Sequence, residues 1–146
     1  LAAASGVLAM QLPRTLGRLE ADPRNPWVHG QTSGDYRNLE QRLLDLSAVH
    51  PDGRAMRIDV VADHHWPLPW TLRGHTAVGY YTPSSPPPAW WSPVLVLDLQ
   101  VLESAPEEVR ARLVEFYGVR PEVLLAVVID RELWDAFLDT RREQSP

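Results

Sequence analysis

Cysteine and lysine are both absent from the 146 residues, so all 14 basic side chains are arginine. Without cysteine the chain has no disulfide, no thiol nucleophile and no thiolate ligand for zinc or an iron–sulfur cluster. Without lysine it has no phosphate-binding loop of the Walker type, and it also lacks the Gly-x-Gly-x-x-Gly and Gly-x-Ser-x-Gly motifs. The formal net charge of −5 gives no basic field for nucleic acid. We therefore expect no nucleic-acid partner and no cofactor.

The composition is that of one soluble globular domain, with 45% hydrophobic and 23% charged residues. The stretch Leu1–Leu12 carries no charge, lacks the basic start of a signal peptide, and is shorter than the roughly 20 residues that cross a bilayer. Two interpretations are open: an amphipathic helix, or the last turns of a transmembrane helix that begins before Leu1. We divide the chain into residues 1–24, the end of a transmembrane helix or a linker, and residues 25–146, a single α/β soluble domain.

Helix and strand patterns alternate along the soluble part. A stripe of apolar residues at helical spacing predicts a helix over 35–49: Tyr36, Leu39, Leu43 and Leu46. The other expected segments are helices over 66–73, 107–113 and around 133–138, and strands over 56–62, 77–81, 94–98, 114–117 and 123–129. This alternation predicts an α/β, three-layer fold with a mostly parallel sheet, helices on both faces and a C-terminal antiparallel hairpin.

Three of the expected strands end in aspartate, at Asp63, Asp98 and Asp130. Ligands bind outside the carboxyl ends of the strands in open α/β sheets, so these carboxylates are candidates for one shared site. His64 and His65 follow Asp63 directly, and carboxylate with imidazole can bind a divalent metal or act as a general base. The competing interpretation, which we favour, is that the aspartates cap helices and that the adjacent histidines point in different directions.

The six tryptophans are an unusual resource, because an exposed indole can stack on a sugar ring or lie at a membrane interface. Trp66 and Trp70 are four residues apart and share one helix face, and we expect them to cover the core, as we expect of Trp134. Trp90 and Trp91 lie in a proline-rich loop, where we expect exposure and stacking on a ligand.

Arg73 ends the expected helix over 66–73. Its guanidinium can bind a phosphate or a carboxylate of a ligand. The alternative, which we favour, is a structural ion pair with Asp63 or Asp98. The candidate ligand-binding residues are therefore Trp90, Trp91, Asp63, His64 and Arg73.

The order of several motifs resembles one known protein family. The opening Asn-Pro-Trp-Val-His-Gly-Gln-Thr-Ser over 25–33 is followed by the expected helix, by Ile58–Ala62, by Trp-Pro-Leu-Pro-Trp-Thr-Leu-Arg over 66–73 and by Val78–Tyr81. This series resembles the soluble C-terminal region of the flippase-activity-associated membrane protein family. That family is related to the dolichyl-phosphate-mannose protein mannosyltransferases of the GT-C type.

The resemblance extends more loosely to Tyr117–Pro121 and Leu125–Trp134. The chain departs from the family pattern in two places. His29 and Gly30 stand where tyrosine and alanine are usual, and Glu122 stands where glycine usually follows the proline.

The resemblance implies a domain on the extracytoplasmic side of the cell membrane, after the last transmembrane helix, and it favours the truncated-helix interpretation of Leu1–Leu12. It implies a parent protein of the polyprenyl-phosphate-sugar-dependent glycosyltransferase type whose catalytic acid lies in an earlier extracytoplasmic loop. No catalytic residue therefore carries over to this chain. We expect a non-catalytic domain that contacts its own transmembrane domain and helps to bind a glycan, a lipid-linked sugar or an acceptor.

Two other functions stay open. A small metal-dependent hydrolase would use Asp63, Asp98 and either His64 or His65, and it requires these side chains to meet in one cleft. A packing module that braces its own membrane domain would show an exposed apolar patch near the N-terminus and no concave pocket.

Overall fold

Residues 34–120 and 122–143 are described by a computed structural model of the chain. The expected boundary at residue 24, the stretch Leu1–Leu12 and the motif over 25–33 lie outside the described residues. Within the described ranges, no helix is long and apolar enough to cross a membrane.

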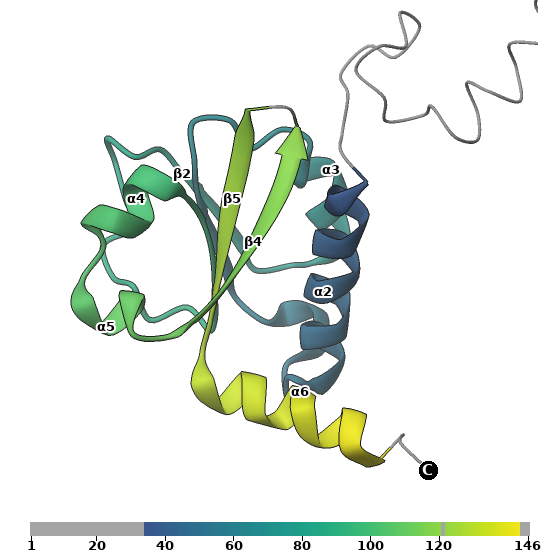
Figure 1. Ribbon diagram of the computed structural model, residues 1–146. Helices are drawn as coiled ribbons and strands as arrows, with labels where there is room; N and C mark the ends of the chain where they lie inside the picture. The colour runs from purple at the N-terminus through teal and green to yellow at the C-terminus, as the bar shows by residue number, and fades with distance from the viewer. Residues whose placement is uncertain (1–33, 121, 144–146) are drawn as a thin grey trace, which may run out of the picture.

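The centre of the fold is a five-stranded sheet in the order β2–β1–β3–β5–β4 (Figure 1). Its strands are β1 (Ile58–Val61), β2 (Val78–Tyr81), β3 (Val94–Asp98), β4 (Leu113–Arg120) and β5 (Val123–Ile129). β1 pairs in parallel with β2 and β3, whereas β5 pairs antiparallel with β3 and β4. The α/β class and the antiparallel hairpin are confirmed. The expectation of a mostly parallel sheet needs correction, because β5 inserts between β3 and β4 and makes the sheet mixed.

Helices pack on both faces of this sheet (Figure 1). One face is covered by α2 (Asp35–Val49), α3 (Leu68–Thr71), α6 (Arg131–Glu143) and the 3-10 turn η3 (Leu72–Gly74). A second 3-10 turn, η2 (Gly53–Ala55), follows α2 and buries no side chain. The other face is covered by α4 (Leu99–Ser104) and α5 (Glu107–Arg110). Because successive strand residues point to opposite faces, Val60 joins the larger core cluster under α2 and Val61 joins the smaller one under α4.

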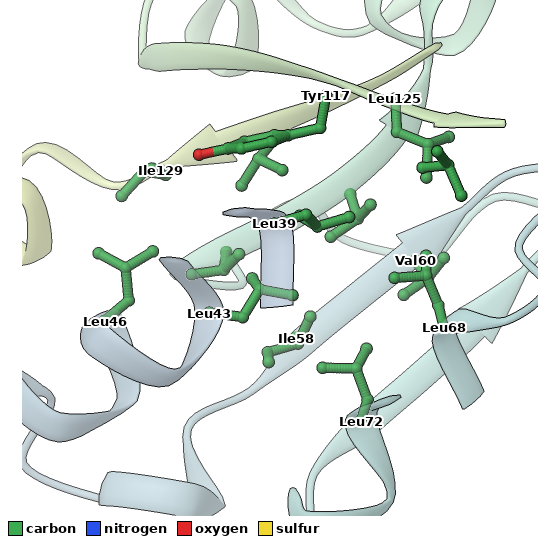
Figure 2. Close-up of a cluster of buried hydrophobic side chains, with 14 of the residues drawn as sticks. Leu39, Leu43, Leu46, Ile58, Val60, Leu68, Leu72, Tyr117, Leu125 and Ile129 are labelled. Carbon is green, nitrogen blue, oxygen red and sulfur yellow. The ribbon is translucent and has the colours of Figure 1, made fainter. Parts of the chain in front are cut away.

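The larger core cluster confirms the predicted stripe of α2. Its four apolar side chains are buried against β1, β4 and β5, and most are drawn in Figure 2: Tyr36, Leu39, Leu43 and Leu46. The helix spans the predicted 35–49 and ends at His50, whose extended backbone suits a residue that precedes proline. Truncating a buried leucine of this stripe to alanine should cost about 2–5 kcal/mol of stability.

The expectation that Trp66 and Trp70 cover the core is wrong, because their side chains are 62% and 64% exposed. The core instead receives Leu68 and Leu72, which are also four residues apart. The helix expected over 66–73 is shorter, because α3 spans only Leu68–Thr71 and Trp66 lies before it, so the four-residue spacing does not put Trp66 on a helix face. Trp134, the third tryptophan expected in the core, is partly buried against the larger cluster.

The segment between β3 and β4 differs from the prediction. The helix α4 follows Asp98 directly and was not expected. The helix expected over 107–113 ends at Arg110, and Leu113 already pairs with Ile129 as the first residue of β4. β4 runs on to Arg120 through a bulge after Gly118, where the sequence predicts a strand that ends at residue 117.

Candidate functional site

Two of the three strand-end aspartates meet at one edge of the sheet. The backbone N–H of Asp63, after β1, donates a hydrogen bond to Oδ2 of Asp98, after β3, at 2.8 Å. β1 and β3 are parallel neighbours, and the chain leaves them toward opposite faces, to α3 and to α4. This is the kind of crevice at which ligands bind in open α/β sheets.

A pocket of about 340 Å³ lies at this edge. Its lining comes from the ends of β1, β2 and β3, from the start of α4 and from the β4–β5 turn: Asp63, His64, Pro83, Asp98, Leu99, Gln100, Glu122, Val123 and Leu124. We call it the strand-end pocket. Two of its polar lining residues, Gln100 and Glu122, are missed by sequence reasoning, because only the sheet order places them there.

Asp130 does not join the strand-end pocket. β5 runs antiparallel to β3, so its carboxyl end lies at the opposite edge of the sheet. There Oδ1 of Asp130 accepts a hydrogen bond from the N–H of Glu132 at 3.0 Å, in the first turn of α6. The prediction of three convergent aspartates is wrong for Asp130, and its alternative as a helix cap is confirmed.

The adjacent histidines take different partners. His64 lines the strand-end pocket, whereas Nδ1 of His65 donates to the carbonyl of Ala62 at 3.1 Å. The His65 ring lies against Tyr80 with 5.6 Å between the ring centroids. Within residues 34–120 and 122–143, no group of three or more histidine, aspartate or glutamate side chains is arranged to hold a metal ion.

A second hollow, of about 500 Å³, lies at the opposite edge of the sheet, where β3 begins and β5 ends. Its lining comes from the end of α2, the loop before β3 and the start of α6: Val49, His50, Pro51, Trp91, Pro93, Asp130, Glu132, Leu133 and Ala136. We call it the Trp91 groove. Trp91 is 65% exposed, so the groove offers a flat apolar ring beside carboxylates and an imidazole.

The proline-rich loop holds Trp91 in a fixed place. The guanidinium of Arg57 lies 5.1 Å from the centroid of the indole. The next residue, Ser92, is buried and donates a hydrogen bond to the carboxylate of Asp59 on β1. Arg112 donates to the carbonyls of Ser92 and Trp90 at 2.9 and 3.0 Å. The ring is therefore presented by backbone that is anchored from two directions.

Arg57 remains a cation in this arrangement. Its hydrogen bond to Asp59, followed by the charge of that carboxylate, raises the pKa of the Arg57 guanidinium. One face of the Trp91 indole is therefore covered by a permanent charge. Of the two adjacent tryptophans, Trp90 is half-buried against the smaller core cluster, so Trp91 is the one that offers an open ring.

Arg73 lies elsewhere and makes neither of the predicted ion pairs. Its guanidinium stacks on the ring of Trp70 at 4.1 Å from the centroid, and Nη1 donates to the carbonyl of Trp70 at 3.1 Å. The favoured prediction, a structural pair with Asp63 or Asp98, is wrong because η3 carries Arg73 along the exposed side of α3.

The five candidate residues therefore do not form one site. Asp63 and His64 share the strand-end pocket, Trp91 lines the groove at the opposite edge, Trp90 packs against the smaller core cluster, and Arg73 stacks on Trp70. Comparison with protein-family models, with curated proteins and with solved structures finds no match to this chain.

Proposed function

We propose that this chain is the non-catalytic, extracytoplasmic C-terminal domain of a multi-spanning glycosyltransferase-like membrane protein. Its task is to bind a glycan beside the transmembrane domain that carries the chemistry. The family assignment is supported by the order of motifs from Asn25 to Tyr81. The ligand is supported by one observation, the exposed indole of Trp91 fixed beside Asp130, Glu132 and His50.

The chemistry of the Trp91 groove suits a sugar ring. One face of a pyranose is apolar and stacks on indole, while its hydroxyl groups donate hydrogen bonds to carboxylates. Glu132 and Asp130 supply those carboxylates at the rim, and His50 adds a nitrogen. Anchoring of the loop by Asp59 means that little conformational freedom is lost on binding.

The charge of the Trp91 groove restricts the chemical class of ligand that it can bind. Two acidic side chains, Asp130 and Glu132, line it together with a single imidazole, His50, and the guanidinium of Arg57 over Trp91 is already paired with Asp59. A phosphate or pyrophosphate would be repelled by these carboxylates. Among a glycan, a lipid-linked sugar and an acceptor protein, the groove therefore favours the uncharged sugar units of a glycan chain.

The test is a titration of the folded 146-residue protein with neutral oligosaccharides at millimolar concentration, followed by NMR of the indole N–H groups. We expect the Trp91 signal and the amides at the start of α6 to shift. Trp91→Ala should abolish the shifts, and Glu132→Gln should weaken binding by about three- to tenfold, the effect of one surface hydrogen bond.

Trp70→Ala is the matched control, because Trp70 is equally exposed but lies beside Arg73, away from the groove. It should bind oligosaccharide like the unmodified protein. Unchanged spectra of the folded protein across a panel of neutral glycans contradict the proposal.

A second function is favoured by the strand-end pocket. The hydrolase hypothesis requires Asp63, Asp98 and a histidine in one cleft, and Asp63, Asp98 and His64 do line one pocket. Its test is product release from chromogenic esters and phosphates with added divalent ions. Activity that disappears in Asp98→Asn and His64→Gln would support a hydrolase, and equal background rates in all three proteins would dismiss it.

A further inference from the structure

Two exposed indoles and an exposed guanidinium lie on the short segment after β1. Trp66 and Trp70 are 62% and 64% exposed, and Arg73 stacks on Trp70 at 4.1 Å. We call these three residues the indole face. We propose that the indole face inserts into the headgroup layer of a lipid bilayer and orients the domain at the membrane.

Exposing two tryptophans of one short segment needs an explanation, because indole is the largest side chain and stabilises a fold when it is buried. Here the fold has turned both rings outward on a rigid base. Leu68 and Leu72 are buried beneath them, and the hydroxyls of Thr71 and Tyr36 are hydrogen-bonded, which fastens α3 to the first turn of α2. The rings therefore form a fixed surface and do not collapse onto the core.

The chemistry of this face is that of the membrane interface. Tryptophan is enriched at the headgroup level, where its ring is partly buried and its N–H finds a hydrogen-bond acceptor. Arg73 is placed between the ring of Trp70 and solvent, so that its guanidinium can donate to lipid phosphate. Stacking on the indole leaves the outer edge of the guanidinium available for that contact.

The distribution of acidic residues along the sequence also favours a lipid bilayer as the partner of the indole face. The protein has 19 acidic residues, yet none lies between Asp63 and Asp98, the interval that contains the indole face. The same interval contains Arg73 and His75 and holds four of the six tryptophans. In a chain of net charge −5, this segment itself adds no acidic side chain that would repel an anionic surface; the carboxylate of Glu40, on α2, acts on Tyr36 beside Thr71. A sugar site is disfavoured here, because the carboxylates that accompany Trp91 have no counterpart in this segment.

The position of the face agrees with attachment to a membrane. Thr71 contacts Tyr36, in the first turn of α2, so the indole face lies at the end of the fold where the residues before Gly34 join (Figure 1). Those residues include the uncharged stretch Leu1–Leu12. The Trp91 groove lies at the other end of α2, a helix of 15 residues that is about 22 Å long at 1.5 Å per residue.

Because the two surfaces lie at opposite ends of α2, binding of the indole face would orient the domain relative to the bilayer. With the indole face in the headgroups, the Trp91 groove opens away from the bilayer, where a glycan chain can reach it and a lipid phosphate does not. The inference rests on the proposed function only in placing the domain beside a membrane. It makes no use of glycan binding.

The test measures binding of the full 146-residue chain to vesicles of phosphatidylcholine, with and without phosphatidylglycerol. The readouts are co-sedimentation and quenching of tryptophan emission by lipids brominated near the headgroup. We expect the double variant Trp66→Ala/Trp70→Ala to lower the partition constant about tenfold and to lose most of the quenching. Arg73→Gln should abolish the preference for vesicles that contain phosphatidylglycerol and leave binding to phosphatidylcholine in place.

Trp91→Ala is the matched control, since Trp91 is as exposed as the other two rings but lies at the opposite edge of the sheet. It should partition and quench like the unmodified chain. Equal binding by the double variant and by Trp91→Ala overturns the proposal and assigns any membrane affinity to another segment. Absence of binding by the unmodified chain overturns it as well.

The glycan titration separates this result from the proposed function. The double variant Trp66→Ala/Trp70→Ala should still show the Trp91 shifts with oligosaccharide, and Trp91→Ala should still bind vesicles. Each variant therefore tests one surface alone. Thermal unfolding of both variants checks that the exposed rings contribute little to stability.

Discussion

Ser92, in the proline-rich loop, donates a hydrogen bond to the buried carboxylate of Asp59 on β1. The same carboxylate receives the guanidinium of Arg57 at 3.2 Å, and Arg57 in turn covers the ring of Trp91. A carboxylate that is 1% exposed is stable only when donors compensate for its lost hydration. The loop that carries Trp91 is thus held to the sheet by a polar contact that the protein cannot remove without cost.

Ser92→Ala tests this anchor. We expect a loss of about 1–3 kcal/mol in the free energy of unfolding, because the Asp59 carboxylate stays buried and loses one donor. The loop should also become less ordered at Trp91, so oligosaccharide affinity should fall together with stability. Urea unfolding and the glycan titration measure the two effects. Ser85→Ala, at an exposed position of the same loop, should change neither, and an equally large effect there would contradict the anchoring role.

Gly79→Ala probes the same contact from the neighbouring strand. A Cβ at residue 79 would lie 2.5 Å from Oδ1 of Asp59 and 2.7 Å from the ring of Tyr81. Both side chains are held by Arg57 and cannot move away freely. We expect a loss of about 2 kcal/mol or more in the free energy of unfolding, measured by urea. In the control Gly34→Ala, the new Cβ meets no described residue within 4 Å, and the change should cost less than about 1 kcal/mol. Similar losses in both variants would show that space at residue 79 is not limiting.

Glu122 occupies a backbone conformation that glycine prefers. Its φ is +69° in the turn between β4 and β5, where a side chain costs about 1–2 kcal/mol. Glu122→Gly should therefore raise the free energy of unfolding by about 1 kcal/mol, measured by urea. Glu122→Gln keeps the Cβ and should change the free energy of unfolding by less than about 0.5 kcal/mol. If Glu122→Gln were stabilised as much as Glu122→Gly, the effect would come from removal of the charge and not from the backbone.

The sequence predicts most of the elements of this fold because their burial patterns are periodic. The stripe from Tyr36 to Leu46 predicts α2 with its observed ends, and the continuous apolar run of β3 predicts a strand buried on both faces. Trp66 and Trp70 are misplaced for a definite reason. The prediction assumes one helix over 66–73, whereas α3 begins at Leu68 and leaves Trp66 before it, and the buried side chains are Leu68 and Leu72.

The candidate sites depend on strand direction, which the local sequence does not encode. Asp63, Asp98 and Asp130 look equivalent in the sequence, since each ends a strand. The antiparallel course of β5 moves Asp130 to the opposite edge, where it caps α6 beside Trp91. The partners of Trp91 in its groove, His50 and Glu132, follow from the same topology. Residue types indicate the chemistry, and pairing of the strands decides which residues share a site.

His75 makes stability depend on pH through a contact with α2. The hydroxyl of Ser47 donates to the carbonyl of Leu43 at 2.8 Å, so the contact of 2.7 Å between Ser47 Oγ and His75 Nε2 requires Nε2 to carry the proton. Nδ1 of His75 is then the bare nitrogen of a neutral ring, buried and with no hydrogen-bond partner among the described residues. Protonation would place an unpaired N–H and a charge there. Burial, followed by the positive charge of Arg54, lowers the pKa of His75 below 6.5.

The direction of the pH dependence follows from this lowered pKa. As the pH falls through about 6.5, the unfolded chain binds a proton at His75 that the folded chain does not, so the free energy of unfolding decreases. The decrease continues until the pH reaches the lower pKa of the folded state, with a slope of at most about 1.4 kcal/mol per pH unit. Urea unfolding between pH 5 and 8 measures it. His75→Gln, which can still donate to Ser47, should flatten the profile in that window, while His64→Gln at an exposed position should retain it. A pH dependence of stability that persists in His75→Gln and is lost in His64→Gln would contradict the prediction, because it would identify His64 as its source.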